Sequence, residues 1–323
     1  MTSCELADSL HGIVPPIVTP LAGPDQLDEA ALERLVEYLV SGGVHGLFIL
    51  GSTGEGPSIS GQVRRQLIDR TCAQVDGRIP VLVGITDPSY AESLLLAQHS
   101  ADAGADAVVL SAPYYFPIEQ VDLLAYAKRL AREAPLPVTL YNVPSLTRIS
   151  FEMATVERLM DEPGIVGIKD SSGDLDYMRK LLDLARQRDD WSLLIGQEHL
   201  LVQALELGAD GGVCGGANVW PQLFVQIYEA TLATTNTDIA EQGDVLSQLV
   251  DKAHQLARIY QLGSGPITAP SVIKGIKAAL AALNICSEEV AQPLQPLSPG
   301  ERSQIESILR EIGIQPALAT EKA

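Results

Sequence analysis

A lysine ends a short apolar run near the middle of the chain, in the stretch 165-IVGIKDSSGD-174. The run before it predicts a buried β-strand, and no turn residue separates that strand from Lys169. An apolar, enclosed site destabilises the charged form of a lysine, so its amine becomes available to form a Schiff base with a carbonyl compound. The alternative is a structural lysine that is ion-paired with a neighbouring carboxylate such as Asp170.

A tyrosine stands at the end of the preceding apolar run, in 141-YNVP-144. If the two strands are neighbours, the phenol of Tyr141 and the amine of Lys169 open into the same space. A phenol beside an amine can carry protons while a carbinolamine forms and loses water. The alternative is a packed ring whose hydroxyl is satisfied elsewhere.

A glycine-rich segment, 51-GSTGEG-56, follows another apolar run. Glycines let the backbone approach a ligand, and the hydroxyls of Ser52 and Thr53 add donors to the exposed N–H groups. Such a segment can hold a carboxylate, although many glycine-rich segments are only turns.

These residues sit in a regular alternation of short β-rich runs and amphipathic helical stretches. The expected strands are Gly12–Thr19, Gly46–Leu50, Val81–Ile85, Ala107–Ser111, Pro137–Val143, Ile165–Lys169, Ser192–Gly196 and Gly211–Gly215. The expected helices are Asp28–Ser41, Gln62–Gln74, Ser89–Ala103, Glu119–Ala134, Phe151–Met160, Leu175–Arg186, Glu198–Leu207 and Pro221–Leu232.

This alternation predicts an α/β fold, a (β/α)8 TIM barrel, in which polar residues at the carboxyl ends of the strands face the active site. The competing doubly wound sheet would carry a nucleotide-type glycine-rich turn after the first strand, where this chain has PPIVTPLAGPD. We expect the barrel to span residues 1–235. A helical C-terminal extension should fill 236–323, with helices near Asp238–Leu262, Ser271–Leu283 and Gly300–Ile312.

The composition excludes several kinds of partner. The 323 residues include 41 acidic and 22 basic side chains, a formal net charge of −19. Such a surface repels nucleic acid and anionic lipid, so neither is an expected partner. Four cysteines without a CxxC spacing indicate no zinc site, and we expect no metal. The first residues lack a signal-peptide pattern and no apolar run approaches about 18 residues, so we expect a cytoplasmic protein.

Three motifs together, GLFILGSTGEG, YNVPSLT and GIVGIKDSS, resemble the dihydrodipicolinate synthase and N-acetylneuraminate lyase family over nearly the whole chain. The resemblance implies a pyruvate-dependent class I aldolase or lyase that joins or cleaves pyruvate and an aldehyde, and that needs no cofactor. Lys169 resembles the Schiff-base lysine, Tyr141 the proton carrier, and Ser52 and Thr53 the pair that binds the carboxylate. Tyr115, in 113-PYYFP-117, resembles an aromatic residue lent by a neighbouring subunit, which with Thr53 and Tyr141 completes a hydroxyl relay in a dimer of dimers.

Other residues are weaker candidates for substrate binding. Gly196 and Glu198 align with family positions that touch the distal part of a substrate, although Glu198 also suits the first turn of a helix. The further candidates are Ser171, Val213 and Gly215. The glycines of 211-GGVCGGAN-218 leave open a pyridoxal-phosphate enzyme that carries its cofactor on Lys169. A barrel that binds a keto acid without turning it over also remains open.

The choice of aldehyde depends on 144-PSLTRIS-150. In the synthase branch of the family, YNVPS is followed by an arginine that binds the carboxylate of aspartate semialdehyde. Here that position is Leu146, which has no donor, and Arg148 lies two residues later. We therefore expect an aldolase or lyase for another 2-keto acid. The alternative is 4-hydroxy-tetrahydrodipicolinate synthesis, in which Arg148 reaches the pocket by a different loop path.

Overall fold

Eight parallel strands form one sheet in the order β1-β10-β9-β8-β7-β6-β5-β4. The computed structural model describes residues 10–236, 240–262 and 265–315. The strands are β1 (Gly12–Ile13), β4 (Leu47–Ile49), β5 (Val81–Gly84), β6 (Ala107–Ser111), β7 (Val138–Asn142), β8 (Ile165–Asp170), β9 (Ser192–Ile195) and β10 (Gly211–Gly212). Each of them lies within or overlaps an expected strand.

The two ends of this sheet meet just beyond β1. Pro16 forms a parallel bridge with Phe48 of β4. The N–H of Ile17 donates to the Phe48 carbonyl at 2.9 Å, and the N–H of Phe48 donates to the Pro15 carbonyl at 3.0 Å. The sheet therefore curls into a (β/α)8 barrel, and the predicted fold class is confirmed.

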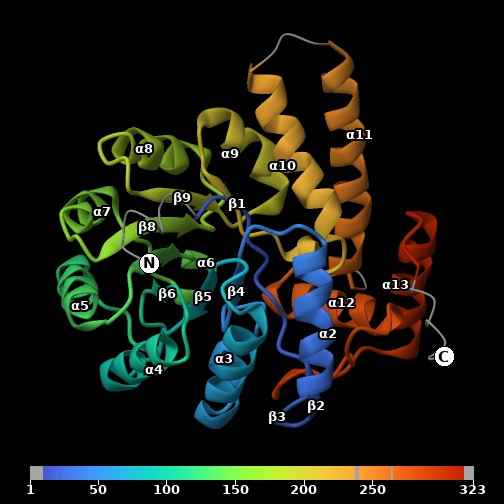
Figure 1. Cartoon of the computed structure of the whole chain (residues 1–323), viewed down its shortest axis with the longest axis horizontal. Helices are drawn as coiled ribbons and strands as arrows, with labels where there is room; N and C mark the ends of the chain where they lie inside the picture. Colours follow the sequence, from blue (N-terminus) through green and yellow to red (C-terminus); the bar gives the residue numbers. More distant parts are fainter. Residues whose placement is uncertain (1–9, 237–239, 263–264, 316–323) are drawn as a thin grey trace.

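Helices cover the outside of the barrel (Figure 1). They are α2 (Glu29–Ser41), α3 (Gly61–Val75), α4 (Tyr90–Asp102), α5 (Gln120–Glu133), α7 (Met153–Met160), α8 (Leu175–Ala185), α9 (Leu201–Leu207) and α10 (Pro221–Asn236). Side chains cap the N-termini of several of these helices. Asp28 accepts a hydrogen bond from the N–H of Ala31 at the start of α2, and Ser60 accepts one from the N–H of Val63 at the start of α3. The sequence did not predict the hairpin β2 (Leu21–Gly23) and β3 (Gln26–Leu27), or the single-turn helix α6 (Pro144–Thr147).

The C-terminal extension is helical, as predicted. It contains α11 (Ala240–Ala257), the 3-10 turn η4 (Arg258–Tyr260), α12 (Ala269–Ala282) and α13 (Pro299–Glu311). The expected start at Asp238 lies outside the described residues, and α10 ends at Asn236, next to the expected boundary of the barrel. Figure 1 shows α12 beside α2, and the Arg34 guanidinium of α2 donates to the carbonyl of Ile285 at 3.0 Å.

Buried side chains form two layers. A smaller cluster fills the barrel interior and takes alternate residues from the strands, among them Phe48, Leu82, Val109, Tyr141 and Val166. The larger cluster lies between the strands and the covering helices. The alternation follows from the pleat of a strand, in which successive side chains point to opposite faces.

One irregularity interrupts this alternation at the strand that carries Lys169. Val138 of β7 pairs with Ile165, whereas Thr139 pairs with Gly167, so β8 contains one residue more than its neighbour at this point. Such a β-bulge re-aims the side chains that follow it. Ile165 and Ile168 both belong to the outer cluster, and Lys169 reaches the interior rings of Phe48 and Tyr141.

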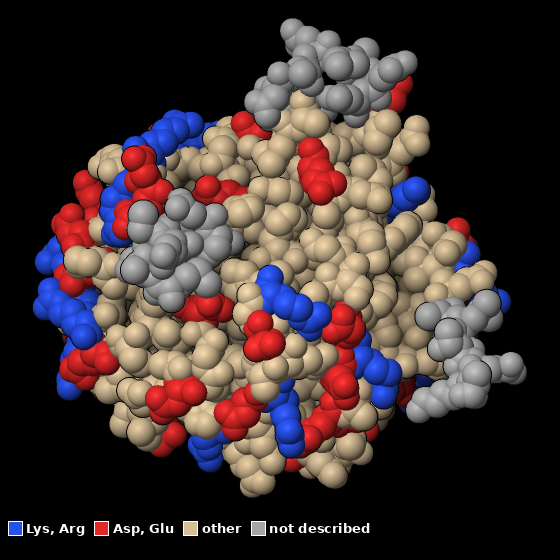
Figure 2. Space-filling model, in the orientation of Figure 1, with Lys and Arg blue, Asp and Glu red and all other residues tan. Residues whose placement is uncertain are grey.

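The surface carries its charges in mixed order. On the face shown in Figure 2, acidic and basic side chains are interspersed over the outer helices, without a continuous basic area. Ion pairs such as Arg78 with Glu37 and Arg70 with Glu29 contribute to this pattern. No helix in the described part of the chain is both long enough and apolar enough to cross a membrane.

Candidate active site

Lys169 and Tyr141 lie directly opposite each other on neighbouring strands, since β7 and β8 pair Tyr141 with Lys169 in register. The Lys169 Nζ lies 3.9 Å from the centre of the Tyr141 ring and 4.9 Å from that of Phe48. The lysine is 5% exposed and the tyrosine 9%. The ammonium therefore sits over two aromatic faces, a cation–π arrangement, with little water around it.

The ion pair between Lys169 and Asp170, which was the structural alternative, is not formed in the described part of the chain. Asp170 faces away from the barrel interior, because successive strand residues alternate. Its carboxylate accepts from the Asn142 amide at 2.8 Å and from the Ser172 hydroxyl at 2.8 Å. Burial raises the pKa of Asp170, although these hydrogen bonds lower it in part. Asp170 thus fixes the strand ends and leaves the amine of Lys169 without a carboxylate partner.

The environment of Tyr141 favours its phenolate. Burial by itself raises the pKa of Tyr141, but the positive charge of Lys169 and hydrogen bonds with Ser171, Ser52 and Lys169 outweigh it. The net pKa is lowered below the ordinary value for a tyrosine. A phenol that is easily deprotonated beside an amine is suited to exchange protons with it.

Ser171 and Gly196 pack against the Lys169 side chain. Ser171 is buried and hydrogen bonds with Tyr141. A Cβ at position 196 would collide with the Ser171 hydroxyl and would lie 2.9 Å from the Lys169 Cε. Glycine is therefore needed at 196 to leave room for the lysine, which is a packing role. Gly196 does not line the cavity described below.

The segment after β4 brings backbone N–H groups and a hydroxyl to the barrel mouth. Leu50 and Glu55 both have positive φ, 58° and 56°, so the chain turns sharply at each end of the segment. Within the described residues, the N–H groups of Ser52 and Thr53 have no intramolecular acceptor. Exposed N–H groups in such a turn can bind an anion. Close packing holds this turn in place, since a Cβ at Gly56 would collide with the carbonyl of Leu50.

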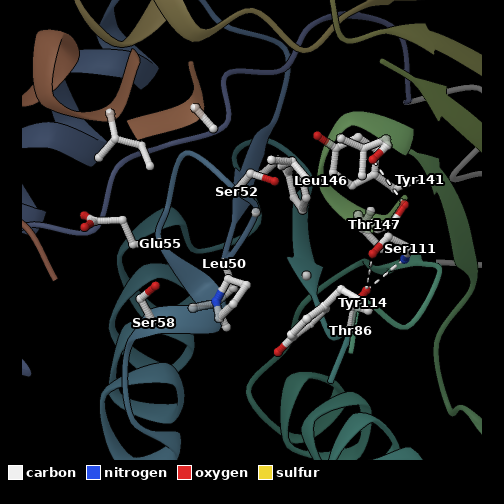
Figure 3. A pocket seen from close by; sticks show the side chains of 18 of the residues that line it. Leu50, Ser52, Glu55, Ser58, Thr86, Ser111, Tyr114, Tyr141, Leu146 and Thr147 are labelled. Carbon is white, nitrogen blue, oxygen red and sulfur yellow. Dashed lines mark hydrogen bonds between the residues drawn. The ribbon is translucent and has the colours of Figure 1, made fainter. Parts of the chain in front are cut away.

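A buried ion pair fastens this segment to the C-terminal extension. The carboxylate of Glu55 contacts the Nζ of Lys277 on α12, and the two side chains are 1% and 0% exposed. Glu55 also accepts from the N–H of Ala291 at 2.7 Å, and Lys277 donates to the carbonyl of Glu289 at 2.6 Å. Burial lowers the pKa of Lys277, although Glu55 opposes this effect. Glu55 thus points away from Tyr141 (Figure 3).

A cavity of about 320 Å³ opens over Tyr141 at the carboxyl ends of β4 to β7. Its lining residues come from these strands, from α6 and from the C-terminal extension (Figure 3): Phe48, Leu50, Gly51, Ser52, Glu55, Pro57, Ser58, Gly84, Thr86, Val109, Ser111, Tyr114, Tyr141, Val143, Leu146, Thr147, Ala269, Pro270, Ile273 and Leu294. Lys169 lies behind the rings of Phe48 and Tyr141, which form part of the lining.

The structure separates the two hydroxyls that the sequence grouped together. Ser52 lines the cavity and hydrogen bonds with Tyr141. Thr53 does not belong to the lining formed by the described residues. The position beside Tyr141 that was predicted for Thr53 in the relay is therefore occupied by Ser52, because the turn at Leu50 aims the first hydroxyl of the pair inward.

Two adjacent tyrosines differ in their placement. Tyr114 lines the cavity, whereas Tyr115 is 73% exposed and packs edge-on against Phe116 at 4.9 Å. The family pattern predicts a role only for Tyr115, so Tyr114 was not predicted. The neighbouring strand end gave the signal for Tyr114, since a polar residue just after β6 falls at the same rim as Tyr141.

Leu146 and Arg148 are placed differently by α6. Leu146 lines the cavity and is 44% exposed. Arg148 follows the helix with φ 60°, is exposed, and does not line the cavity. The loop path that would bring the Arg148 guanidinium into the pocket is not adopted.

Glu198, Val213 and Gly215, which follow β9 and β10, do not line this cavity. Val213 belongs to the interior cluster. Glu198 accepts from the N–H of Gly216 at 2.8 Å, and burial raises the pKa of this carboxyl despite that bond. A substrate that fills this cavity would therefore not touch these three residues, and their expected contacts with its distal part stay a prediction.

The same segment does not fit a cofactor phosphate. The Glu198 carboxyl group already accepts from the N–H of Gly216, so this donor is not free to bind a phosphate. The Asn218 amide donates to the carbonyls of Pro16 and Gly215, both at 3.0 Å, which closes the loop on itself. The described residues hold no group of three or more potential metal ligands. These contacts disfavour the pyridoxal-phosphate alternative.

The model of the dihydrodipicolinate synthetase family matches residues 9–312. The chain belongs to this family. It is 36% identical over 257 residues to a probable 2-dehydro-3-deoxy-D-pentonate aldolase of Escherichia coli, covering 78% of this chain and 82% of that protein.

Solved structures of other family members superpose closely. The dihydrodipicolinate synthase of Bacteroides thetaiotaomicron has a TM-score of 0.87 and 42% identity, and covers 94% of this chain and 98% of that one. The Escherichia coli protein YagE, solved in complex with pyruvate, has a TM-score of 0.85 and 29% identity over 94% of this chain and 98% of that one. The prediction of a pyruvate-dependent aldolase or lyase of this family is confirmed.

The lowered pKa of Tyr141 gives this family member a spectroscopic signature. The Lys169 ammonium lowers that pKa, whereas burial raises the pKa of Tyr114, Tyr126 and Tyr260. On alkaline titration followed by phenolate absorbance, we expect an early step of one tyrosine that Tyr141→Phe removes. Lys169→Met should move this step to higher pH. Tyr114→Phe is the matched control and should leave it in place; an early step that survives in Tyr141→Phe would contradict the geometry.

The ion pair between Glu55 and Lys277 predicts a specific pattern of stability. Lys277→Met leaves the Glu55 carboxylate buried without a counter-charge, which typically costs about 3–5 kcal/mol of unfolding free energy. The double variant Glu55→Gln/Lys277→Met removes both charges and should recover most of the loss. Chemical denaturation gives the free energy of unfolding of the wild type, the single variant and the double variant. Arg129→Met, which breaks an exposed pair with Glu133, serves as a control with little effect. A double variant that is no more stable than Lys277→Met would refute the coupling.

Proposed function

We propose that this protein is a class I aldolase or lyase in which Lys169 forms a Schiff base with pyruvate or a related 2-keto acid. The observation that carries the proposal is the position of the Lys169 amine, 3.9 Å from the Tyr141 ring centre and behind the wall of a cavity. The amine attacks the C2 ketone to give a carbinolamine, which loses water to become a protonated imine. This imine accepts electrons when a C3 proton leaves, so the reaction requires no metal or organic cofactor.

We assign the proton transfers to Tyr141. Its lowered pKa suits it to accept a proton from the attacking amine and to return that proton to the departing hydroxyl. Ser52 and Ser171 hold the phenol by hydrogen bonds. Ser52 thereby takes the relay position, and Tyr115, exposed at 73%, is available to complete the relay in a second copy of the chain.

The carboxylate of the keto acid binds to the segment after β4 in this proposal. The N–H groups of Ser52 and Thr53 are its donors. Thr53 then binds through its backbone. We further propose a cytoplasmic homo-oligomer, a dimer of dimers in the manner of the family pattern, in which the Tyr115–Phe116 surface contacts a neighbouring subunit.

For the carbon–carbon bond, the enamine attacks an aldehyde, or the reverse reaction releases one. Condensation with aspartate semialdehyde is the second candidate, since the Bacteroides thetaiotaomicron structure is named a dihydrodipicolinate synthase. Leu146 stands against it, because this cavity-lining side chain offers no donor to a second carboxylate. The first candidate, an aldolase for another 2-keto acid, is therefore preferred.

Reductive trapping tests the nucleophile. Incubation with pyruvate and borohydride should add the mass of a reduced pyruvyl group, and peptide mapping should place it on Lys169. Lys169→Ala should remain unmodified and inactive. Lys180, on the outer helix α8, is the internal control in the same digest and should stay unlabelled. A folded, pyruvate-saturated protein with no adduct on Lys169 would refute the proposed function.

A further inference from the structure

In the part of the chain that the structure describes, no cation in the outer part of the cavity over Tyr141 could bind a second anionic group. Among the described lining residues there is no arginine, lysine or histidine. The one charged residue of the lining, Glu55, is neutralised by Lys277 and also accepts from Ala291. Arg148 stays outside the cavity. A carboxylate or phosphate on the aldehyde would thus lose its water without gaining a counter-charge, which is strongly unfavourable.

Most hydroxyls in the lining are already used within the protein. The N–H and the hydroxyl of Ser111 both donate to the Thr86 hydroxyl, at 2.8 and 3.2 Å. The Thr147 hydroxyl donates to the carbonyls of Val143 and Ile149, at 3.1 and 2.9 Å. These bonds hold the strand ends and α6 in place (Figure 3). They leave the hydroxyls of Ser58 and Tyr114 and the proton of the Thr86 hydroxyl outside the proposed keto-acid end, which are few donors for a polyhydroxylated substrate.

Apolar side chains from three parts of the chain form the remaining surface. The C-terminal extension contributes Ala269, Pro270, Ile273 and Leu294. The barrel contributes Leu50 and Val143, and α6 contributes Leu146. Cavities that bind small molecules are lined mainly by apolar groups, with a few polar groups that fix orientation. In this cavity Ser52 and Tyr141 are polar groups of that kind at the proposed keto-acid end, and Ser58 and Tyr114 are the few that lie outside it.

We infer that the aldehyde partner is uncharged and carries an apolar chain or ring, and that Leu146, Ile273 and Leu294 select it. This inference rests on the proposed function. The bond forms between C3 of the enamine and the aldehyde carbon, and the aldehyde oxygen takes a proton to become a hydroxyl. Water then hydrolyses the imine and returns the free Lys169 amine with a 4-hydroxy-2-oxo acid. Cleavage runs the same steps in reverse, and neither direction involves oxidation or reduction.

Two matched pairs of aldehydes test the inference with the full-length protein and pyruvate. Butanal and succinic semialdehyde share a four-carbon chain but differ by a carboxylate, and kcat/KM should favour butanal by at least about 30-fold. Propanal and glyceraldehyde share a three-carbon chain, and propanal should be favoured by about 10- to 100-fold. Equal or reversed preference in either pair overturns the inference, as does failure of both apolar aldehydes to react.

Variants of α6 identify the selecting residue. Leu146→Arg should raise kcat/KM for succinic semialdehyde relative to butanal by at least tenfold, because it adds a donor to the cavity. Arg148→Asn is the matched control, since Arg148 lies outside the cavity and asparagine tolerates its positive φ; the ratio should not change. A ratio that responds to Arg148→Asn and not to Leu146→Arg overturns the assignment. Borohydride trapping of pyruvate on Lys169 distinguishes failure of the proposed function from failure of this inference. If no pyruvate is trapped on Lys169, the proposed function is refuted. If pyruvate is trapped but the aldehyde preference is the opposite of that expected, only the inference is refuted.

Discussion

The direction in which Lys169 points depends on one extra residue in β8. Ile165, the first residue of β8, faces the helices and Val166 faces the interior, so without an interruption Lys169 would face the helices as well. The bulge at Val166 and Gly167 shifts the alternation by one residue. Lys169 then faces the barrel interior, opposite Tyr141, and Asp170 faces outward to Asn142. This single register shift places the Lys169 amine beside Tyr141 and turns the carboxylate of Asp170 away from both.

The C-terminal extension is part of the site as much as the barrel is. The buried pair of Glu55 and Lys277 joins α12 to the segment that carries Ser52, and Ile273 and Leu294 add apolar wall to the cavity. Removing either charge would leave the other buried and unpaired, so this interaction holds the segment after β4 and the extension together. The proposed sites of the keto acid and of the aldehyde would therefore be coupled through the extension.

Much of this architecture could be predicted because the pattern of apolar residues is local. The eight strands and the helices that follow them show the periodicities of buried strands and amphipathic helices, and sequential order makes β7 and β8 neighbours. The adjacency of Tyr141 and Lys169 follows from that order. The sequence of α12 also indicates a buried charge. Lys277 follows Ile273 by four residues and so lies on the apolar face of the helix, where a lysine needs a partner such as Glu55.

The remaining features depend on contacts between distant segments. The bulge in β8 is defined only by the pairing with β7, and the inward turn of Ser52 depends on the backbone at Leu50 and on Gly56 packing against it. The wall formed by Ile273 and Leu294 depends on how the extension packs on the barrel. No local pattern encodes these arrangements, so the sequence predicted the adjacency of Tyr141 and Lys169 better than it predicted which residues line the cavity.

The proposed mechanism requires Tyr141 to exchange protons with the Lys169 amine, which lies opposite it in the register of β7 and β8. The most direct measurement is the rate constant for imine formation between pyruvate and Lys169, followed by rapid quenching in borohydride, in wild type and in Tyr141→Phe. Positioned acid–base groups typically contribute about 10²–10⁴-fold, so imine formation should slow by that factor while the melting temperature stays close to that of wild type. Imine formation at the wild-type rate in Tyr141→Phe would contradict the account.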